Sequence, residues 1–335
     1  LSGHGYSMKK TKMNKSVLNF CQISLKNNIP IIIENYFELK KLYKNIKIFI
    51  VCPEKDVVEF KQKITFDEVS ILSEEKIISF ESFKEIYEKN SKDILYKNNF
   101  ESRLSWYYQQ ILKISFVLNF IKVKKENIII WDADTLILKK IDFFFNNSSI
   151  YYGTFNEFHN QYFETNKTIL NFQEKFHISF LTQFASLTTD EGKLILDTLK
   201  LDNYDDKKLY LNLSELILKS IFKTHKIYNG SMFSEYELIG QINYENKLKK
   251  QKPILSLRFG LNGKLTNFQK FIAKILNFKH VTYENNHFKK ESVGMLERKQ
   301  TNTYFFFLIL KNLIKFRIRN FRFNKKFKKN LLKKT

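Results

Sequence analysis

The chain has 335 residues, 43% of them hydrophobic and 16% aromatic, and this composition excludes a wholly disordered protein. A formal net charge of +23 indicates an anionic partner such as nucleic acid, anionic lipid or a phosphate-bearing substrate. The two cysteines, Cys21 and Cys52, have neither the spacing of a metal site nor that of a disulfide framework. We therefore expect two buried free thiols in a reducing compartment.

The first part of the chain alternates between short apolar runs and segments with apolar residues at helical spacing. The apolar runs predict strands at residues 17–25, 46–51, 69–72 and 127–131. The helical spacing predicts helices between them, at residues 31–43, 57–64, 80–87 and 102–120. Such alternation is typical of an α/β fold with a mostly parallel central sheet flanked by helices.

Weaker patterns extend the prediction toward residue 276. Further strands are expected at residues 151–155, 177–187 and 254–259. One further helix is expected to begin after a cap at Thr188 or Thr189 and to end near residue 199. Three more are expected at residues 209–222, 234–248 and 268–276. We divide the chain into residues 1–15 as a tag or disordered start, 16–290 as one large domain, and 300–335 as a basic tail.

The basic tail differs in kind from the large domain. Residues 311–335 contain eleven lysines or arginines and no acidic residue, interleaved with leucine, isoleucine and phenylalanine. A basic amphipathic helix suits the interface of an anionic membrane, and the alternatives are a solvated charge run or a nucleic-acid-binding tail. The longest apolar run, residues 304–310, is far short of the about 20 residues of a membrane span. We expect a cytoplasmic protein that is peripheral at the inner face of the cytoplasmic membrane.

The motif that carries chemistry is the tripeptide Asp132-Ala133-Asp134, directly after the apolar run at residues 128–131. Two carboxylates at the end of a buried strand repel one another and need desolvation, so they are unfavourable for folding alone. Their oxygens are the hard ligands that Mn²⁺ or Mg²⁺ prefers, and such a metal would bridge the diphosphate of a nucleotide sugar. The alternative is a solvated turn in which Asp134 caps the following segment.

Four segments resemble a known group of enzymes in the same order along the chain. They are residues 106–113 (WYYQQILK), 131–141 (WDADTLILKKI), 157–165 (EFHNQYFET) and 233–237 (FSEYE). Together they are similar to GT-A-type glycosyltransferases, and especially to a largely uncharacterised bacterial family regarded as Asp-X-Asp glycosyltransferases. The resemblance covers roughly residues 45–260. It implies a GT-A-like (Rossmann-like) catalytic domain at residues 16–290, with Asp132 and Asp134 as metal ligands and Asp134 favoured as the direct one.

The resemblance also implies a donor-binding role for the predicted helix at residues 102–120. Arg103, Gln110 and Lys113 on this helix would bind the nucleotide sugar together with Asp132. Arg103 and Gln110 are seven residues apart, so they share a helical face. Lys113 and Arg103 could meet phosphates, the arginine through two parallel hydrogen bonds. The alternative is a core helix whose polar residues are merely solvated.

Later segments supply the acceptor side of the implied site. Glu157, His159 and Tyr162 would lie on a loop near the donor sugar or the acceptor. Glu235 would be the catalytic carboxylate, because sugar transfer with inversion needs a base that deprotonates the acceptor hydroxyl. For His159 the alternative is an ordinary structural histidine.

Two further residues have competing interpretations. Ser234 and Glu237 have the spacing of a helix capping box, which accounts for Glu237 and leaves Glu235 available. Many GT-A enzymes that the chain resembles add a C-terminal histidine to the metal shell. His280 and His287 are available, and His287 is the one we assign to the metal; the alternative is a surface histidine.

The sequence therefore predicts a metal-dependent glycosyltransferase that uses a nucleotide-sugar donor, with UDP favoured as the nucleotide. The acceptor would be a cell-surface or lipid-linked glycan such as lipooligosaccharide or capsule. The runner-up is a metal-dependent nuclease or other phosphate-binding enzyme acting on nucleic acid, although the chain has no recognisable nucleic-acid-binding signature and only one clear carboxylate pair. A third hypothesis is that the protein is a peripheral membrane scaffold with a degenerate enzyme core.

Overall fold

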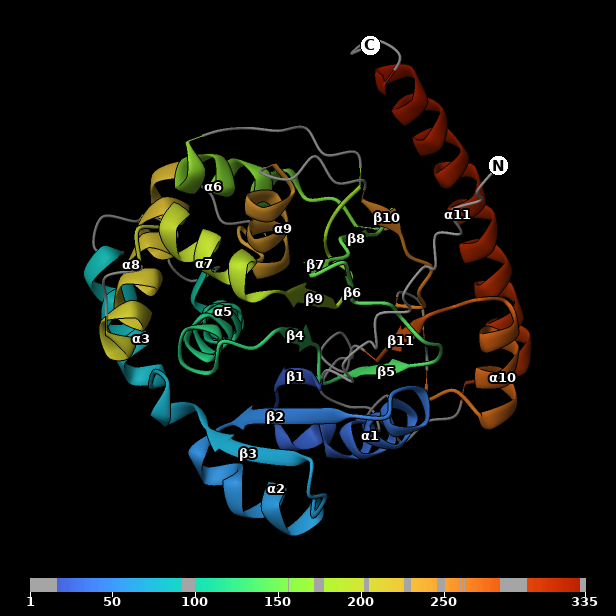
Figure 1. Cartoon of the computed structure of the whole chain (residues 1–335), viewed down its shortest axis with the longest axis horizontal. Coiled ribbons are helices and arrows are strands. Elements are labelled where there is room, and N and C mark those ends of the chain that lie inside the picture. Colours follow the sequence, from blue (N-terminus) through green and yellow to red (C-terminus); the bar gives the residue numbers. More distant parts are fainter. Residues whose placement is uncertain are drawn as a thin grey trace, which may run out of the picture.

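The computed structural model describes residues 17–91, 100–155, 157–171, 178–201, 205–225, 230–245, 251–258, 261, 263–283 and 300–331. Within these ranges the chain forms an α/β fold in which helices cover a mixed, mostly parallel sheet (Figure 1). The predicted fold class is confirmed at this level. The predicted start at residues 1–15 lies outside the described residues.

The central sheet has five strands in the order β3-β2-β1-β4-β9. Its strands are β1 (Leu18–Ile23), β2 (Ile46–Cys52), β3 (Val69–Ser73), β4 (Ile128–Trp131) and β9 (Phe184–Leu187). The first four are parallel, and β9 pairs antiparallel with β4. Because β1 lies between β2 and β4, the sheet is built outward in both directions from its first strand.

Helices cover the two faces of this sheet. They are α1 (Ile29–Leu42), α2 (Val57–Lys63), α3 (Phe80–Asn90), α5 (Leu104–Lys124), α6 (Asn160–Leu170), α7 (Thr189–Thr198), α8 (Asp206–Thr224) and α9 (Glu235–Glu245). Side chains on one sheet face, such as Ile128 and Ile130, join a core with α5, whereas Ile129 and Trp131 point into a core with α1. Both faces of β4 are thus buried, as its continuous apolar sequence predicts.

A local capping signal fixes the start of α7. The Thr188 hydroxyl accepts a hydrogen bond from Glu191 N at 3.3 Å, and Glu191 Oε2 accepts one from Thr188 N at 3.0 Å. This reciprocal capping box satisfies backbone donors that the first turn leaves unpaired. The predicted cap at Thr188 or Thr189 is therefore confirmed at Thr188.

A C-terminal unit, residues 251–331 where described, packs beside this sheet. It contains β10 (Lys252–Pro253), α10 (Asn267–Ile275), β11 (His280–Thr282) and α11 (Asn302–Leu331). Strand β11 pairs antiparallel with β5 (Thr135–Ile137), the segment directly after the Asp-X-Asp tripeptide. A third buried cluster, which includes Leu136, Val281 and Phe305, joins this unit to α1. Figure 1 shows α10 and α11 side by side along one edge of the molecule.

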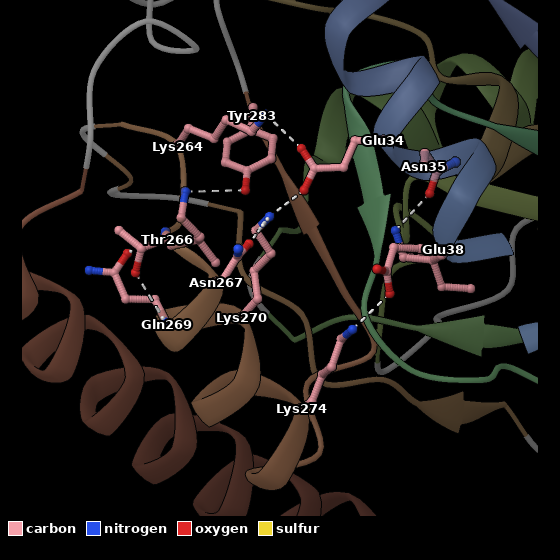
Figure 2. Close-up of polar contacts among 12 residues, drawn as sticks. Glu34, Asn35, Glu38, Lys264, Thr266, Asn267, Gln269, Lys270, Lys274 and Tyr283 are labelled. Atoms are coloured by element: carbon pink, nitrogen blue, oxygen red, sulfur yellow. Dashed lines mark hydrogen bonds and ion pairs between the residues drawn. The ribbon is translucent and has the colours of Figure 1, made fainter. Parts of the chain in front are cut away.

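Ion pairs supplement this apolar contact between α1 and α10 (Figure 2). Lys264 Nζ lies 2.6 Å from Glu34 Oε2, and Lys270 bonds the other oxygen of the same carboxylate. Lys274 Nζ lies 2.7 Å from Glu38 Oε2. Each pair is partly exposed and contributes at most about 1 kcal/mol, so the apolar cluster provides most of the attachment.

The remaining elements are short. They are the 3-10 helices η1 (Lys26–Asn28), η2 (Glu54–Asp56) and η3 (Glu74–Lys76), and the strands β6 (Phe144–Phe145), β7 (Ser148–Ser149) and β8 (Tyr152–Gly153). None of the helices within the described ranges combines the length and the apolar character that crossing a membrane requires.

Three predicted strands differ from the structure. The one at residues 254–259 is wrong, because its described residues form only an isolated bridge from Leu257 to Val281. Of residues 151–155 only Tyr152–Gly153 is a strand, and of the predicted strand at 177–187 the described residues, 178–187, form a strand only at Phe184–Leu187. The apolar residues before β9 pack on α9 instead, where the ring of Phe180 lies so close to Gly240 that a Cβ there would meet it at 2.2 Å.

Candidate functional site

A tight turn at the carboxyl end of β4 carries the Asp-X-Asp tripeptide. Asp132 N donates to Gln183 O at 2.9 Å, and Thr135 N donates to Asp132 O at 3.0 Å. The indole nitrogen of Trp131 donates to Thr135 O at 2.8 Å, which closes the turn from the buried side. These bonds hold the backbone of Asp132 and Asp134 between β4 and β5.

Lys113 of α5 reaches this turn from one face of the sheet. Its Nζ lies 2.6 Å from Asp132 Oδ1 and 2.7 Å from Glu235 Oε1, and its side chain is only 8% exposed. Burial opposes the charge on Lys113, but the two carboxylates outweigh it, so the pKa of Lys113 is raised. Lys113 is thus a buried cation between two carboxylates that are 103 residues apart in sequence.

The first turn of α9 completes the cluster. Tyr236 OH donates to Asp132 Oδ1 at 2.6 Å, and Lys113 Nζ lies 5.0 Å from the centre of the Tyr236 ring. Burial, reinforced by the charge of Asp132, raises the pKa of Tyr236, and burial also raises the pKa of Glu235. We call Lys113, Asp132, Glu235 and Tyr236 the buried polar cluster. Tyr236 was not among the residues predicted for the site, although it belongs to the segment FSEYE that carries the resemblance.

The other predicted residues of α5 take different positions. Gln110 is buried, and its Oε1 accepts a hydrogen bond of 3.4 Å from Glu235 N, one of the donors left unpaired at the start of a helix. Arg103 is half-buried at the start of α5 and donates to the hydroxyl of Ser231. Gln110 and Lys113 therefore meet the first turn of α9, whereas Arg103 contacts the segment that leads into it.

The segment with Glu157, His159 and Tyr162 lies near Arg103 and Ser231, because Tyr162 interacts with both. Glu157 pairs with Arg258, and its Oε1 lies 3.4 Å from His159 Nε2. The rings of His159 and Tyr162 are 4.8 Å apart. Burial lowers the pKa of His159; the charge of Glu237 opposes this effect and that of Arg103 adds to it. The charge of Arg103 also acts on Tyr162, which places this segment near the start of α5.

Glu237 does not form the predicted capping box. Its Oε1 accepts hydrogen bonds from Phe180 N at 3.0 Å and from the hydroxyl of Ser179, so this carboxylate ties α9 to the segment before β9. Burial raises the pKa of Glu237 to about 7. Glu235 and Glu237 do point to different surroundings, as their spacing on a helix predicts.

Only one of the two candidate histidines lies within the described residues. His287 lies outside them. His280 is fully buried, with its ring centre 6.0 Å from that of Trp131 and 5.8 Å from that of Phe184. Burial lowers the pKa of His280 to about 3, so it is a neutral side chain packed against Trp131 and Phe184.

Asp132 and Asp134 could hold a divalent cation if substrate phosphates and water supplied its other ligands. The described residues contain no group of three or more His, Cys, Asp or Glu side chains placed to hold a metal. Mg²⁺ in phosphate-handling sites is commonly bound by one or two carboxylates, with substrate phosphates and water as the other ligands. Asp132 and Asp134 match that donor set. Asp134 also acts electrostatically on Tyr236, so the second carboxylate of the tripeptide lies near the buried polar cluster.

Comparison with known proteins places this region in a defined family. A family model matches residues 33–243, more than half of the chain, and is described as a family of unknown function (DUF6492). The matched region runs from α1 to α9 and contains the buried polar cluster. No curated protein matches the chain.

Proposed function

The chain belongs to the DUF6492 family of unknown function, and we propose that it is a metal-dependent glycosyltransferase with a nucleotide-sugar donor and a GT-A-like fold. The observation that carries this proposal is the buried polar cluster around Lys113, beside the Asp-X-Asp turn. Buried charges are unfavourable for stability unless they are paired, and their concentration in one place is typical of functional sites.

The order of the sheet supports a ligand site at this turn. Chain connections run from β1 toward β2 and β3 on one side and toward β4 on the other. In open α/β sheets, ligands bind beyond the carboxyl ends of the strands at such a switch point. Asp132 and Asp134 follow β4 at this point. The position therefore favours nucleotide binding over a purely structural turn.

Each residue of the buried polar cluster has a distinct role in the proposal. Asp134 and Asp132 would hold Mn²⁺ or Mg²⁺, which would stabilise negative charge on the departing nucleoside diphosphate. Lys113 and Tyr236 both bond Asp132 Oδ1 and so fix the orientation of that carboxylate. Arg103, half-buried at the start of α5, is the cation that we assign to a donor phosphate.

The position of Glu235 favours a different role from the expected general base. Its side chain is 1% exposed and its Oε1 is bonded to Lys113. A base must come within hydrogen-bond distance of the acceptor hydroxyl. We therefore assign Glu235 to positioning Lys113. Glu157, His159 and Tyr162 remain the proposed contacts to the donor sugar or acceptor, and His159 is the most accessible titratable group among them, with 42% of its side chain exposed.

The substrates follow from the resemblance and from the charge of the chain. UDP is the favoured donor nucleotide, and the proposed acceptor is a cell-surface glycan such as lipooligosaccharide or capsule. The nuclease alternative gains no support within the described ranges, because no further carboxylates join the pair in a metal-binding group.

Release of nucleoside diphosphate from nucleotide sugars tests this proposal. With Mn²⁺, the full chain is expected to hydrolyse one nucleotide-sugar family slowly, and Asp134→Asn is expected to reduce the rate by about 100-fold or more. The matched control is Asp142→Asn, an exposed aspartate eight residues further along, which should retain the rate. Equal rates in Asp134→Asn and the control would show that the tripeptide does not act in the reaction.

A further inference from the structure

Helix α11 is fixed to the molecule by one face. Phe305, Leu308 and Ile309 are buried in the third cluster, with the partly buried Phe316 packed against it. Further along, the ring of Phe323 is 6.1 Å from that of Phe155. Phe316 and Phe323, two of the phenylalanines interleaved with the cations of the tail, therefore pack against the rest of the molecule.

The opposite face of α11 exposes large apolar side chains in a row. They recur at intervals of three or four residues and are 48–71% exposed, and they are Phe307, Leu310, Ile314, Ile318 and Phe321. This spacing places them along one stripe of the helix. We call these five residues the outward stripe.

Cations border the outward stripe along its length. The exposed cations on this side of the helix are Lys311, Lys315, Arg317, Arg322 and Lys325, whereas the exposed Arg319 lies toward the inner face. The helix as a whole holds nine lysines or arginines and no acidic residue. Their long side chains can lie along an apolar surface while their charges reach lipid phosphates.

We propose that the outward stripe and its bordering cations form a docking surface for an anionic lipid bilayer, with α11 lying in the plane of the interface. A nucleic acid would match the cations but would leave the central apolar row against a polar backbone. A second copy of α11 would bury the row but would bring two strongly basic helices together. An anionic bilayer meets both features at once, because apolar side chains enter below the headgroups while cations remain among them.

The same helix contacts the segment that leads to the proposed acceptor site. Arg319 donates to Phe155 O, and the ring of Phe155 lies 5.9 Å from that of Phe316. Glu157 is two residues beyond. These contacts lie on the inner face of α11, so a docked α11 would hold this segment one helix diameter, about 10 Å, from the bilayer, a distance that favours a lipid-linked glycan as the acceptor class. This last step rests on the proposed function, whereas the docking surface does not.

Vesicle binding by the full chain tests the docking surface. In EDTA and without nucleotide, the protein is expected to float with phosphatidylglycerol–phosphatidylcholine vesicles, to bind pure phosphatidylcholine weakly, and to dissociate as salt rises. Ile314→Glu with Ile318→Glu should reduce partitioning to anionic vesicles at least about tenfold. The matched control, Val58→Glu with Val123→Glu, changes residues of similar exposure on α2 and α5 and should bind as the unmodified chain does.

Several outcomes would overturn the docking surface. One is equal binding by the stripe variant and the unmodified chain. Another is absence of binding to anionic vesicles. A third is a dimer, detected by sedimentation velocity, that the stripe variant abolishes. A fourth is a complex with duplex DNA that is stronger than the complex with vesicles and that the stripe variant also abolishes. Asp134→Asn is expected to bind vesicles normally, so failure of the enzyme proposal and failure of the docking surface give different results.

Discussion

At the scale of single residues, Lys113 supplies the positive charge that compensates the buried carboxylates of the site. It lies between Asp132 and Glu235 with little access to water. From sequence we expected the carboxylates of the Asp-X-Asp tripeptide to repel one another without compensation. The structure supplies the compensating cation from α5, a helix that precedes β4 in the chain. Removing one partner of such a buried pair leaves the other charge unpaired.

Lys113→Met is therefore expected to lower the free energy of unfolding by about 3–5 kcal/mol, measured by urea denaturation. Adding Glu235→Gln to this variant should recover part of the loss, because it removes one of the two unpaired carboxylates. Lys124→Met, at an exposed lysine of the same helix, should change the free energy by less than about 0.5 kcal/mol. A change in Lys113→Met no larger than that control would mean that the ion pairs do not form in solution.

At the scale of elements, one face of α11 packs against the rest of the molecule and the opposite face carries the outward stripe. Phe305 is fully buried in the third cluster, whereas Phe307, two residues later, is 63% exposed on the outward stripe. Both residues are phenylalanines in the same helix, so they form an internal comparison. Their difference lies only in which face of α11 they occupy.

Phe305→Ala should reduce the free energy of unfolding by about 3–5 kcal/mol, because it removes a fully buried ring and leaves a cavity. Phe307→Ala should leave it unchanged within about 0.5 kcal/mol. Chemical denaturation of both variants checks this. Similar losses in the two variants, or none in either, would contradict the assignment of the inner face.

The elements also show where sequence patterns were sufficient. Strand β2 and helix α1 agree with the sequence interpretation to within about two residues, because each has a strong apolar period of its own. Residues 178–183 are as apolar as a strand, yet only Phe184–Leu187 pairs with β4. Packing of Phe180 against α9 competes with strand pairing there, and such a contact between distant segments leaves no local pattern.

The candidate site shows the same limit. Asp132 and Asp134 could be found because they follow a recognisable buried strand. Lys113 was implied by the resemblance, but its partners could not be predicted, since they depend on how α5 and α9 pack against one another. Glu235 was expected to be the catalytic base, and only the tertiary structure shows that its side chain is buried.

At the scale of the whole molecule, a sheet with a charged site at its switch point is joined to a basic helix that runs along one edge of the molecule (Figure 1). The family match ends at residue 243, before α10 and α11. The proposed division is therefore between a sugar-transfer site in the family region and a membrane contact in the C-terminal unit.

The most direct test of the central claim is the melting temperature of the full chain with UDP-, GDP- and CMP-sugars, each in Mn²⁺ and in EDTA. Saturation of a site that exists only in the folded protein adds about 3 kcal/mol at 100 times the dissociation constant, which corresponds to a rise of a few degrees. We predict such a rise with one nucleotide family, in Mn²⁺ only. A cooperative melt at the same temperature with every nucleotide, in Mn²⁺ and in EDTA alike, would contradict a metal-dependent nucleotide-sugar site at Asp132 and Asp134.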